Sequence, residues 1–135
     1  MGMPAARAGD NVVAVDTHIV LVPSPGGPVP TPLPHPFSGT ITGGVSTNVL
    51  IGGAPAATLG STATNAPPHL PTPPGTSFTI PPTNQGTIVK GSATVLINSK
   101  PAARVGDTVM TCNDPAPLPV GNIVGPGALT VLIGG

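Results

Sequence analysis

Residues 92–107 read SATVLINSKPAARVGD, and the stretch STNVLIGGAPAATLGS at residues 46–61 aligns with them without a gap. Both copies contain V-L-I, then three further residues, then P-A-A, with a glycine five positions after the proline. The chain ends with the first half of this unit, ALTVLIGG at 128–135, and begins with the second half, MPAARAGD at 3–10. This split third copy predicts a closed ring of three repeats in which the first and last strands lie side by side.

The three units of the predicted ring have the same internal order. Their approximate bounds are 125–135 plus 1–37, 38–85 and 86–124. In each unit a glycine-containing turn precedes the apolar V-L-I run, and a short turn separates that run from P-A-A. The pattern predicts β-hairpins in which the V-L-I side chains alternate between a core face and an exposed base.

Proline-rich stretches follow the hairpins, at 23–36, 67–82 and 115–126. Such segments favour stiff, extended backbone of the polyproline type and exclude helix. We therefore expect an all-β chain whose hairpins are joined by proline-rich loops.

The composition excludes several classes of protein. The 135 residues suffice for one domain, and we expect a single domain over residues 1–135. Four basic residues at zero net charge are too few to neutralise a phosphate track, which argues against nucleic-acid binding. No apolar run approaches the length of about 20 residues that a membrane span needs. The N-terminus lacks the pattern of a cleaved secretion signal, so we expect synthesis and folding in the cytoplasm.

Four of the few charged side chains lie in the repeated octet, namely Arg7, Asp10, Arg104 and Asp107. The middle repeat has Thr58 and Ser61 in their place, so both charges are absent together. Because an unpaired charge is costly in a dry environment, a pair should appear or disappear as a unit. This favours two structural ion pairs, Arg7–Asp10 and Arg104–Asp107. The alternative is that all four charges are solvated on loops.

Three histidines and one cysteine supply the soft metal donors of the chain, namely His18, His35, His69 and Cys112. Three imidazole nitrogens and one thiolate fit a tetrahedral zinc site. His18 and His69 each lie nine residues after the glycine of their octet, and Cys112 lies near the corresponding place in the third unit. A three-fold ring could bring these positions to one axial point, where His35 could fold back as the fourth ligand. The alternative is that these are unrelated surface histidines and a cysteine buried as a small hydrophobe.

The octets MPAARAGD and KPAARVGD carry a Pro-Ala-Ala-Arg signature, and over most of its length the chain resembles the PAAR-repeat proteins. The resemblance implies a small cone of short β-hairpins with pseudo-three-fold symmetry. It implies that the base of the cone caps and sharpens a trimeric β-helical spike of the valine-glycine-repeat type. Such spikes belong to type VI secretion and to phage-like contractile injection particles. The apex would hold one structural zinc ion, bound by His18, His35, His69 and Cys112.

The resemblance further implies a structural protein and not an enzyme. Its role would be to help puncture a target envelope, with transient contact with the target membrane, and to carry effector cargo. It would be delivered at the tip of the injection apparatus. Two features depart from the family pattern: the middle repeat, PAAT, lacks the arginine, and the proline-rich insertions 23–36 and 67–82 are long. The insertions could reshape the apex or form a docking surface for cargo.

Two other functions stay open at this level. A zinc-dependent hydrolase would need an open coordination position and a general base, whereas four ligands would close the site and the chain has no glutamate. The second alternative is a proline-rich scaffold or adaptor without a spike role. Asp16 and Asp114 lie near the candidate ligands and could orient them as hydrogen-bond acceptors, although each could equally be a turn aspartate.

Overall fold

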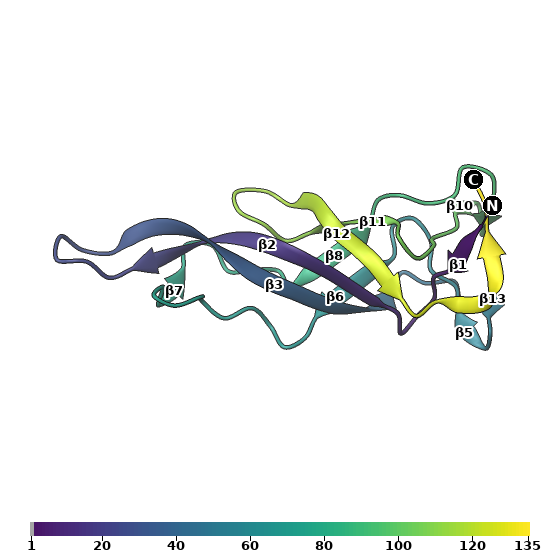
Figure 1. The fold of residues 1–135 in the computed structure, drawn as a ribbon, viewed down its shortest axis with the longest axis horizontal. Coiled ribbons are helices and arrows are strands. Elements are labelled where there is room, and N and C mark those ends of the chain that lie inside the picture. The colour runs from purple at the N-terminus through teal and green to yellow at the C-terminus, as the bar shows by residue number, and fades with distance from the viewer. Residues whose placement is uncertain (1) are drawn as a thin grey trace.

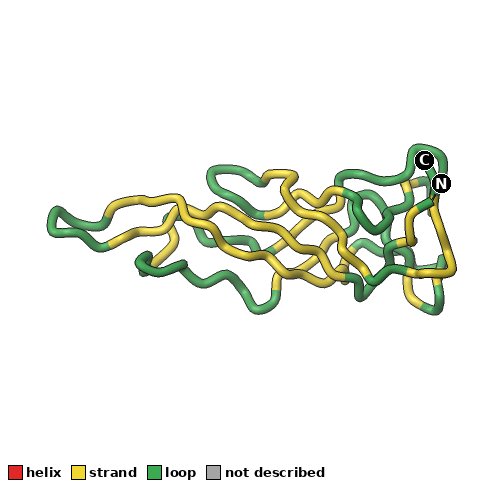
Figure 2. The backbone as a smooth tube through the Cα atoms, viewed as in Figure 1, coloured by secondary structure: helices red, strands yellow, loops and turns green. Residues whose placement is uncertain are grey.

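A computed structural model describes residues 2–135 as an elongated arrangement of β-strands (Figure 1). The strands are β1 (Met3–Ala5), β2 (Asn11–Val22), β3 (Val29–Gly43), β4 (Leu50–Ile51), β5 (Ala54–Pro55), β6 (Thr62–Asn65), β7 (Ser77–Phe78), β8 (Gln85–Ile88), β9 (Leu96–Ile97), β10 (Lys100–Pro101), β11 (Thr108–Thr111), β12 (Leu118–Gly125) and β13 (Ala128–Ile133). Figure 2 shows only strands and loops, and residues 2–135 contain no helix, which confirms the all-β prediction. Among these residues there is accordingly no helix that could span a lipid bilayer.

The two ends of the chain lie together at one end of the molecule (Figure 1). β1 pairs antiparallel with β13, with Met3 opposite Ile133 and Pro4 opposite Leu132. β4 pairs with β5, and β9 with β10, in the corresponding hairpins of the other two repeats. The prediction that the first and last strands lie side by side is therefore confirmed.

The two continuous hairpins turn through two residues each. These are Gly52–Gly53, with φ of 59° and 86°, and Asn98–Ser99, with φ of 52° and 67°. Two successive residues with positive φ are typical of the type I′ turn, whose twist matches that of the flanking strands. The V-L-I and P-A-A segments therefore form tight hairpins, as their spacing predicts.

The Pro-Ala-Ala segments of the three repeats are joined by a closed cycle of hydrogen bonds. The amide of Ala6 donates to the carbonyl of Ala103 at 3.0 Å. The amide of Ala103 donates to the carbonyl of Ala57, also at 3.0 Å. The amide of Ala57 closes the cycle on the carbonyl of Ala6 at 3.1 Å. All three alanines are completely buried. Their small side chains allow the three backbones to approach closely enough for these bonds.

Equivalent residues of the three repeats also build the apolar core. The larger cluster includes Val12, Ala63, Val109, Ile41, Ile88 and Ile123. The smaller cluster, at the end that holds the termini, includes Ile51, Ile97 and Ile133. The leucine before each of these last isoleucines faces outward, with exposed fractions of 60% for Leu50, 62% for Leu96 and 60% for Leu132. We call these three side chains the base leucines. The predicted alternation is confirmed for each leucine and the isoleucine that follows it, whereas Val95 and Val131 remain exposed, at 36% and 37%.

The longest hairpin, β2–β3, projects at the end opposite the termini (Figure 1). Its register runs from Asn11 opposite Thr40 to Val22 opposite Val29. The prediction of a loop over 23–36 is wrong for most of that stretch, because β3 begins at Val29. The proline-rich stretch 115–126 likewise lies largely in a strand, β12.

Proline is tolerated in β3 because it occurs there at alternate positions, which are 30, 32, 34 and 36. Even-numbered residues of this strand direct their backbone polar groups away from β2: the Ser38 amide bonds Asn65 Oδ1, and the Pro34 carbonyl accepts the Thr72 hydroxyl. The missing N–H groups of the prolines therefore fall on the outer edge of β3, where no ladder requires them. The odd-numbered residues remain free to pair with β2.

Candidate metal centre

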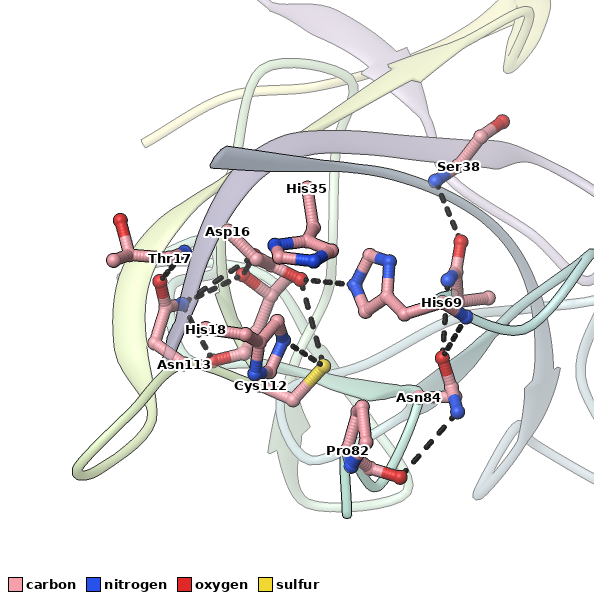
Figure 3. Close-up of polar contacts among 12 residues, drawn as sticks. Asp16, Thr17, His18, His35, Ser38, His69, Pro82, Asn84, Cys112 and Asn113 are labelled. Atoms are coloured by element: carbon pink, nitrogen blue, oxygen red, sulfur yellow. Dashed lines mark hydrogen bonds and ion pairs between the residues drawn. The ribbon is translucent and has the colours of Figure 1, made fainter. Parts of the chain in front are cut away.

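Side chains from three separate parts of the chain meet in the interior beside the β2–β3 hairpin (Figure 3). Asp16 and His18 lie on β2, and His35 lies on β3. His69 follows β6, and Cys112 comes directly after β11. Residues 16 and 18 share one face of β2 because side chains alternate along a strand. All five side chains belong to buried residues, with exposed fractions of 0% to 8%.

Four of these residues can each place one donor atom within 4.8 Å of the other three, namely Asp16, His18, His69 and Cys112. The closest approaches are 3.0 Å between His69 Nε2 and Asp16 Oδ2, 3.4 Å between Cys112 Sγ and Asp16 Oδ2, and 3.6 Å between Cys112 Sγ and His18 Nε2. Imidazole, thiolate and carboxylate are the donor types of tetrahedral zinc sites. The cluster could therefore bind a metal ion.

His35 lies beside this four-donor set but not within it. Its Nδ1 is 2.8 Å from the carbonyl oxygen of Leu33, and its Nε2 accepts the backbone N–H of Thr72 at 3.1 Å. The ring still packs closely on the cluster, with centroid distances of 5.3 Å to His18 and 5.6 Å to His69. Of the four residues expected as ligands, the structure thus brings His18, His69 and Cys112 within 4.8 Å of one another, together with Asp16, and packs the His35 ring against them.

Burial shifts the pKa values of two of the donors. It lowers the pKa of His18, against the opposing effect of the Asp114 carboxylate. Burial and the nearby Asp16 carboxylate raise the pKa of Cys112 to about 11. His18 is therefore a neutral imidazole near pH 7, which is the form that binds metals. Cys112 must lose a proton before it can act as a ligand.

One buried nitrogen of the cluster lacks a hydrogen bond. His18 Nδ1 has no hydrogen-bond partner, and it lies 3.5 Å from Asp114 Oδ2. The Asp114 carboxylate also accepts the Ile19 amide at 2.9 Å. A buried polar atom without a partner is uncommon and is frequent at functional centres. The cation fit rests on the donor chemistry, because two imidazoles, a thiol and a carboxylate are the donor types of tetrahedral zinc sites and His18 meets Cys112 through its other nitrogen, Nε2.

An outer layer of polar side chains fixes the orientation of the donors. Asp16 Oδ1 accepts hydrogen bonds from the Thr111 hydroxyl and, at 3.3 Å, from Asn113 Nδ2. The backbone amide of His69 donates to Asn84 Oδ1 at 2.8 Å. Such outer partners orient ligands and hold them in position before an ion arrives. In Figure 3, Asn113 lies on one side of the cluster and Asn84 on the other.

Two pockets adjoin the cluster. One of about 380 Å³ is lined by His35 and His69 among others. Another of about 180 Å³ is lined by His18 and Cys112 among others. The donors, although buried, therefore border two hollows through which an ion could reach them.

The two expected ion pairs of the octets differ from each other. Arg104 Nη2 lies 3.0 Å from Asp107 Oδ1, and Arg104 Nε lies 3.2 Å from Asp107 Oδ2. Arg7 does not reach the Asp10 carboxylate with its guanidinium. Its Nη1 donates instead to the carbonyl of Ile51 at 3.2 Å. The expected side-chain pair between Arg7 and Asp10 does not form. Hydrogen bonds from the Arg7 guanidinium to the hairpin turn of the next repeat take its place.

The three octets share a hydrogen bond from a backbone amide to a side-chain oxygen. The last residue of each octet accepts the amide of the residue three positions earlier, as in Arg7 N to Asp10 Oδ2 at 3.0 Å, Thr58 N to Ser61 Oγ at 3.0 Å and Arg104 N to Asp107 Oδ2 at 2.8 Å. Arg104 also reaches the turn of the following repeat, at the Gly134 carbonyl, 3.3 Å away. Thr58 is too short to do so. A pocket of about 210 Å³ lined by Thr58, Asn98 and Lys100, among others, lies at this junction.

From the sequence, Asp16 was expected at most to orient the ligands as a hydrogen-bond acceptor. The sequence did contain a signal that Asp16 lies beside the donors. Asp16 and His18 are two residues apart in a β-prone run, and this spacing puts both side chains on one face of a strand. The separation of His35 from the donor set had no sequence signal, because it depends on a contact with Thr72, 37 residues away.

Comparison with known proteins agrees with this architecture. The model of the family described as PAAR motif matches residues 78–135. This segment contains the third octet and Cys112. The comparison with curated proteins gave no match. The PAAR motif family is structural and is associated with the spike tips of contractile injection systems. Over residues 78–135 the chain is therefore similar to the PAAR motif family. The hydrogen-bonded cycle joins the corresponding Pro-Ala-Ala segments of all three repeats.

Proposed function

We propose that this protein caps and sharpens the trimeric β-helical spike of a contractile injection machine. The spike would be of the valine-glycine-repeat type, in a type VI secretion system or a phage-like particle. The observation that carries the proposal is the near-equal exposure of the base leucines, at 60%, 62% and 60%. They come from equivalent positions of the three repeats, at the end that holds the termini.

A trimeric partner explains these three side chains together. A homotrimer presents three identical surfaces around its axis, and a single chain matches them best with three equivalent contacts. Large apolar side chains exposed in one region mark an interaction surface. The cycle of hydrogen bonds through Ala6, Ala57 and Ala103 supports a pseudo-three-fold base of this kind.

The opposite end of the molecule would meet the target envelope. The β2–β3 hairpin projects there, and the chain has only four acidic and four basic residues, which reduces the penalty for transient contact with a lipid core. A zinc ion held by the cluster would act as a structural crosslink between β2 and the segments that carry His69 and Cys112. In this proposal the protein is not an enzyme. It is made in the cytoplasm and delivered at the tip of the apparatus, and the proline-rich segments offer a place for effector cargo.

Co-purification with a trimeric β-helical spike protein from the same source tests the proposal. The variant in which Leu50, Leu96 and Leu132 are all changed to Asp should lose the complex. A matched control changes three exposed apolar residues away from the base, Val15, Leu70 and Leu118, to Asp; it should keep the complex. Thermal melting of both variants checks that each is folded. Unchanged binding by the folded base variant would refute the proposed docking surface.

A further inference from the structure

All the acidic side chains of this protein are shielded from solvent. The chain has four aspartates and no glutamate. Three of the aspartates are at most 3% exposed, and the side chain of the fourth is 5% exposed; in chain order they are Asp10, Asp16, Asp107 and Asp114. The exposed charge of the side chains is therefore positive, although the net charge of the sequence is zero.

The two exposed lysines lie close to the base leucines. Lys90 and Lys100 are both exposed. Lys100 begins β10, which pairs with the strand that carries Leu96. Gly91, the neighbour of Lys90, packs directly on Pro101 of the same hairpin. Both ammonium groups therefore belong to the end of the molecule that is proposed to dock.

The opposite end carries no formal charge. Residues 17–89 contain no Asp, Glu, Lys or Arg, and they include the tip of the β2–β3 hairpin. Of the two arginines, Arg104 is neutralised by Asp107, and Arg7 lies at a base hairpin, 3.4 Å from the Gly52 carbonyl. The positive potential of the side chains is therefore concentrated around the base leucines.

A pocket beside Lys100 offers hydrogen-bond donors that the protein itself does not use. It is the pocket of about 210 Å³ at the junction of the second and third repeats, and its lining includes Asn48 and Thr58. Thr58 is 3% exposed, and within residues 2–135 its hydroxyl has no hydrogen-bond partner. Asn48 accepts bonds from Ser46 and Asn98 through Oδ1, which leaves its amide nitrogen free to donate.

These donors suit a carboxylate. A hydroxyl, an amide N–H and an ammonium can all donate to the two oxygens of one anion, and bonds to a charged acceptor are the stronger ones. No acidic side chain lines the pocket. At the other two junctions Arg7 or Arg104 extends to the turn of the following repeat, so the hollow follows from the loss of arginine at Thr58.

We propose that the base docks on an acidic surface, and that the pocket at the Thr58 junction receives an Asp or Glu carboxylate of that surface. Lys90 and Lys100 attract the partner before contact, and the base leucines then supply the apolar contact. The inference rests on the proposed spike role for the identity of the partner, but the pocket can be tested without the partner.

The association rate of the full-length chain with the spike protein, measured at low and high salt, tests the acidic surface. Lys90→Gln with Lys100→Gln should slow association by about tenfold at low salt and by much less at high salt. Val15→Glu with Leu70→Glu changes the net charge equally but away from the base, and should stay within about threefold of the wild-type rate.

The outcomes separate this inference from the spike role. A wild-type rate that does not depend on salt, or an equal fall in the control variant, would overturn the acidic surface and leave the spike role intact. Failure of the wild-type chain to bind the spike would refute the spike role instead. The pocket would then still be decided by the titration that follows.

Titration of the isolated chain with sodium acetate, against sodium chloride at equal ionic strength, tests the pocket by amide chemical shifts. Acetate should shift the amides of Asn48 and Thr58 saturably. Thr58→Val keeps the shape and removes the hydroxyl, and Lys100→Gln removes the charge; each should weaken acetate binding by about fivefold or more. Lys90→Gln, outside the pocket lining, should bind acetate as the wild type does. The absence of saturable shifts, or equal binding by Thr58→Val, would overturn the assignment.

Discussion

Replacement of Asp107 by serine should destabilise the protein far more than the same replacement of Asp10. Serine is the natural residue of the middle repeat, where Ser61 Oγ accepts the Thr58 amide at 3.0 Å. The substitution therefore preserves the turn hydrogen bond in either octet. At Asp107 it also removes the carboxylate that the Arg104 guanidinium contacts at 3.0 Å and 3.2 Å.

The structure sets the size of this difference. Asp107 is 3% exposed and Arg104 is 9% exposed, so the pair is largely removed from water. Removal of one partner of a buried pair costs about 3–5 kcal/mol. We expect the lower end, about 3 kcal/mol, because Arg104 keeps its bond to the Gly134 carbonyl. Asp10→Ser removes only the bond from the Gly127 amide to Oδ1, for which about 1 kcal/mol is expected.

Urea unfolding of the zinc-loaded variants, followed by far-ultraviolet circular dichroism, measures both free energies. The double variant Arg104→Thr with Asp107→Ser reproduces the pair of the middle repeat. It should recover at least half of the stability lost by Asp107→Ser, because no buried cation remains unpaired. Equal destabilisation by Asp10→Ser and Asp107→Ser, or a double variant no more stable than the single one, would refute the reasoning.

Three further predictions concern the metal centre and the altered middle repeat. First, protein freed of metal should lose about 2–3 kcal/mol of stability between pH 9 and 11, because the unfolded Cys112 thiol ionises first while its folded pKa is raised to about 11. Cys112→Ser should remove this loss. Identical profiles of stability against pH for the variant and the wild-type protein would contradict the assignment of the loss to Cys112. Second, zinc at 100 times its dissociation constant should stabilise the chain by about 2.7 kcal/mol. A melting temperature that does not respond to a chelator would argue against a structural ion. Third, Thr58→Arg with Ser61→Asp should fill the pocket at that junction and raise the free energy of unfolding by about 1 kcal/mol; an unchanged or lower value in urea would show that the junction does not accept the arginine of the other repeats.

The hairpins and the pairing of the first strand with the last could be predicted, because both depend on the spacing of the repeated motifs along the sequence. The repeats place V-L-I and P-A-A at fixed separations, and the two half-repeats at the ends complete one unit. Alternation along a strand then predicted that Leu50, Leu96 and Leu132 would point away from their neighbouring isoleucines. These features are local, or follow directly from the repeat.

The features that were missed depend on contacts that no local pattern encodes. Proline in a sequence normally argues against a strand, but in β3 its alternate spacing leaves one edge free to pair. Arg7 was expected to bond Asp10, three residues away, and instead reaches Ile51, 44 residues away. Asp16 joins the donor set only because His69 and Cys112 fold against the same face of β2.

In the proposed complex, one chain of this protein caps one trimeric spike. Native mass spectrometry of the complex with the trimeric β-helical protein measures this stoichiometry directly. We expect one copy of this chain for three copies of the spike subunit, and loss of that species when the base leucines are changed to Asp. Three copies of this chain per trimer, or no complex at all, would contradict it.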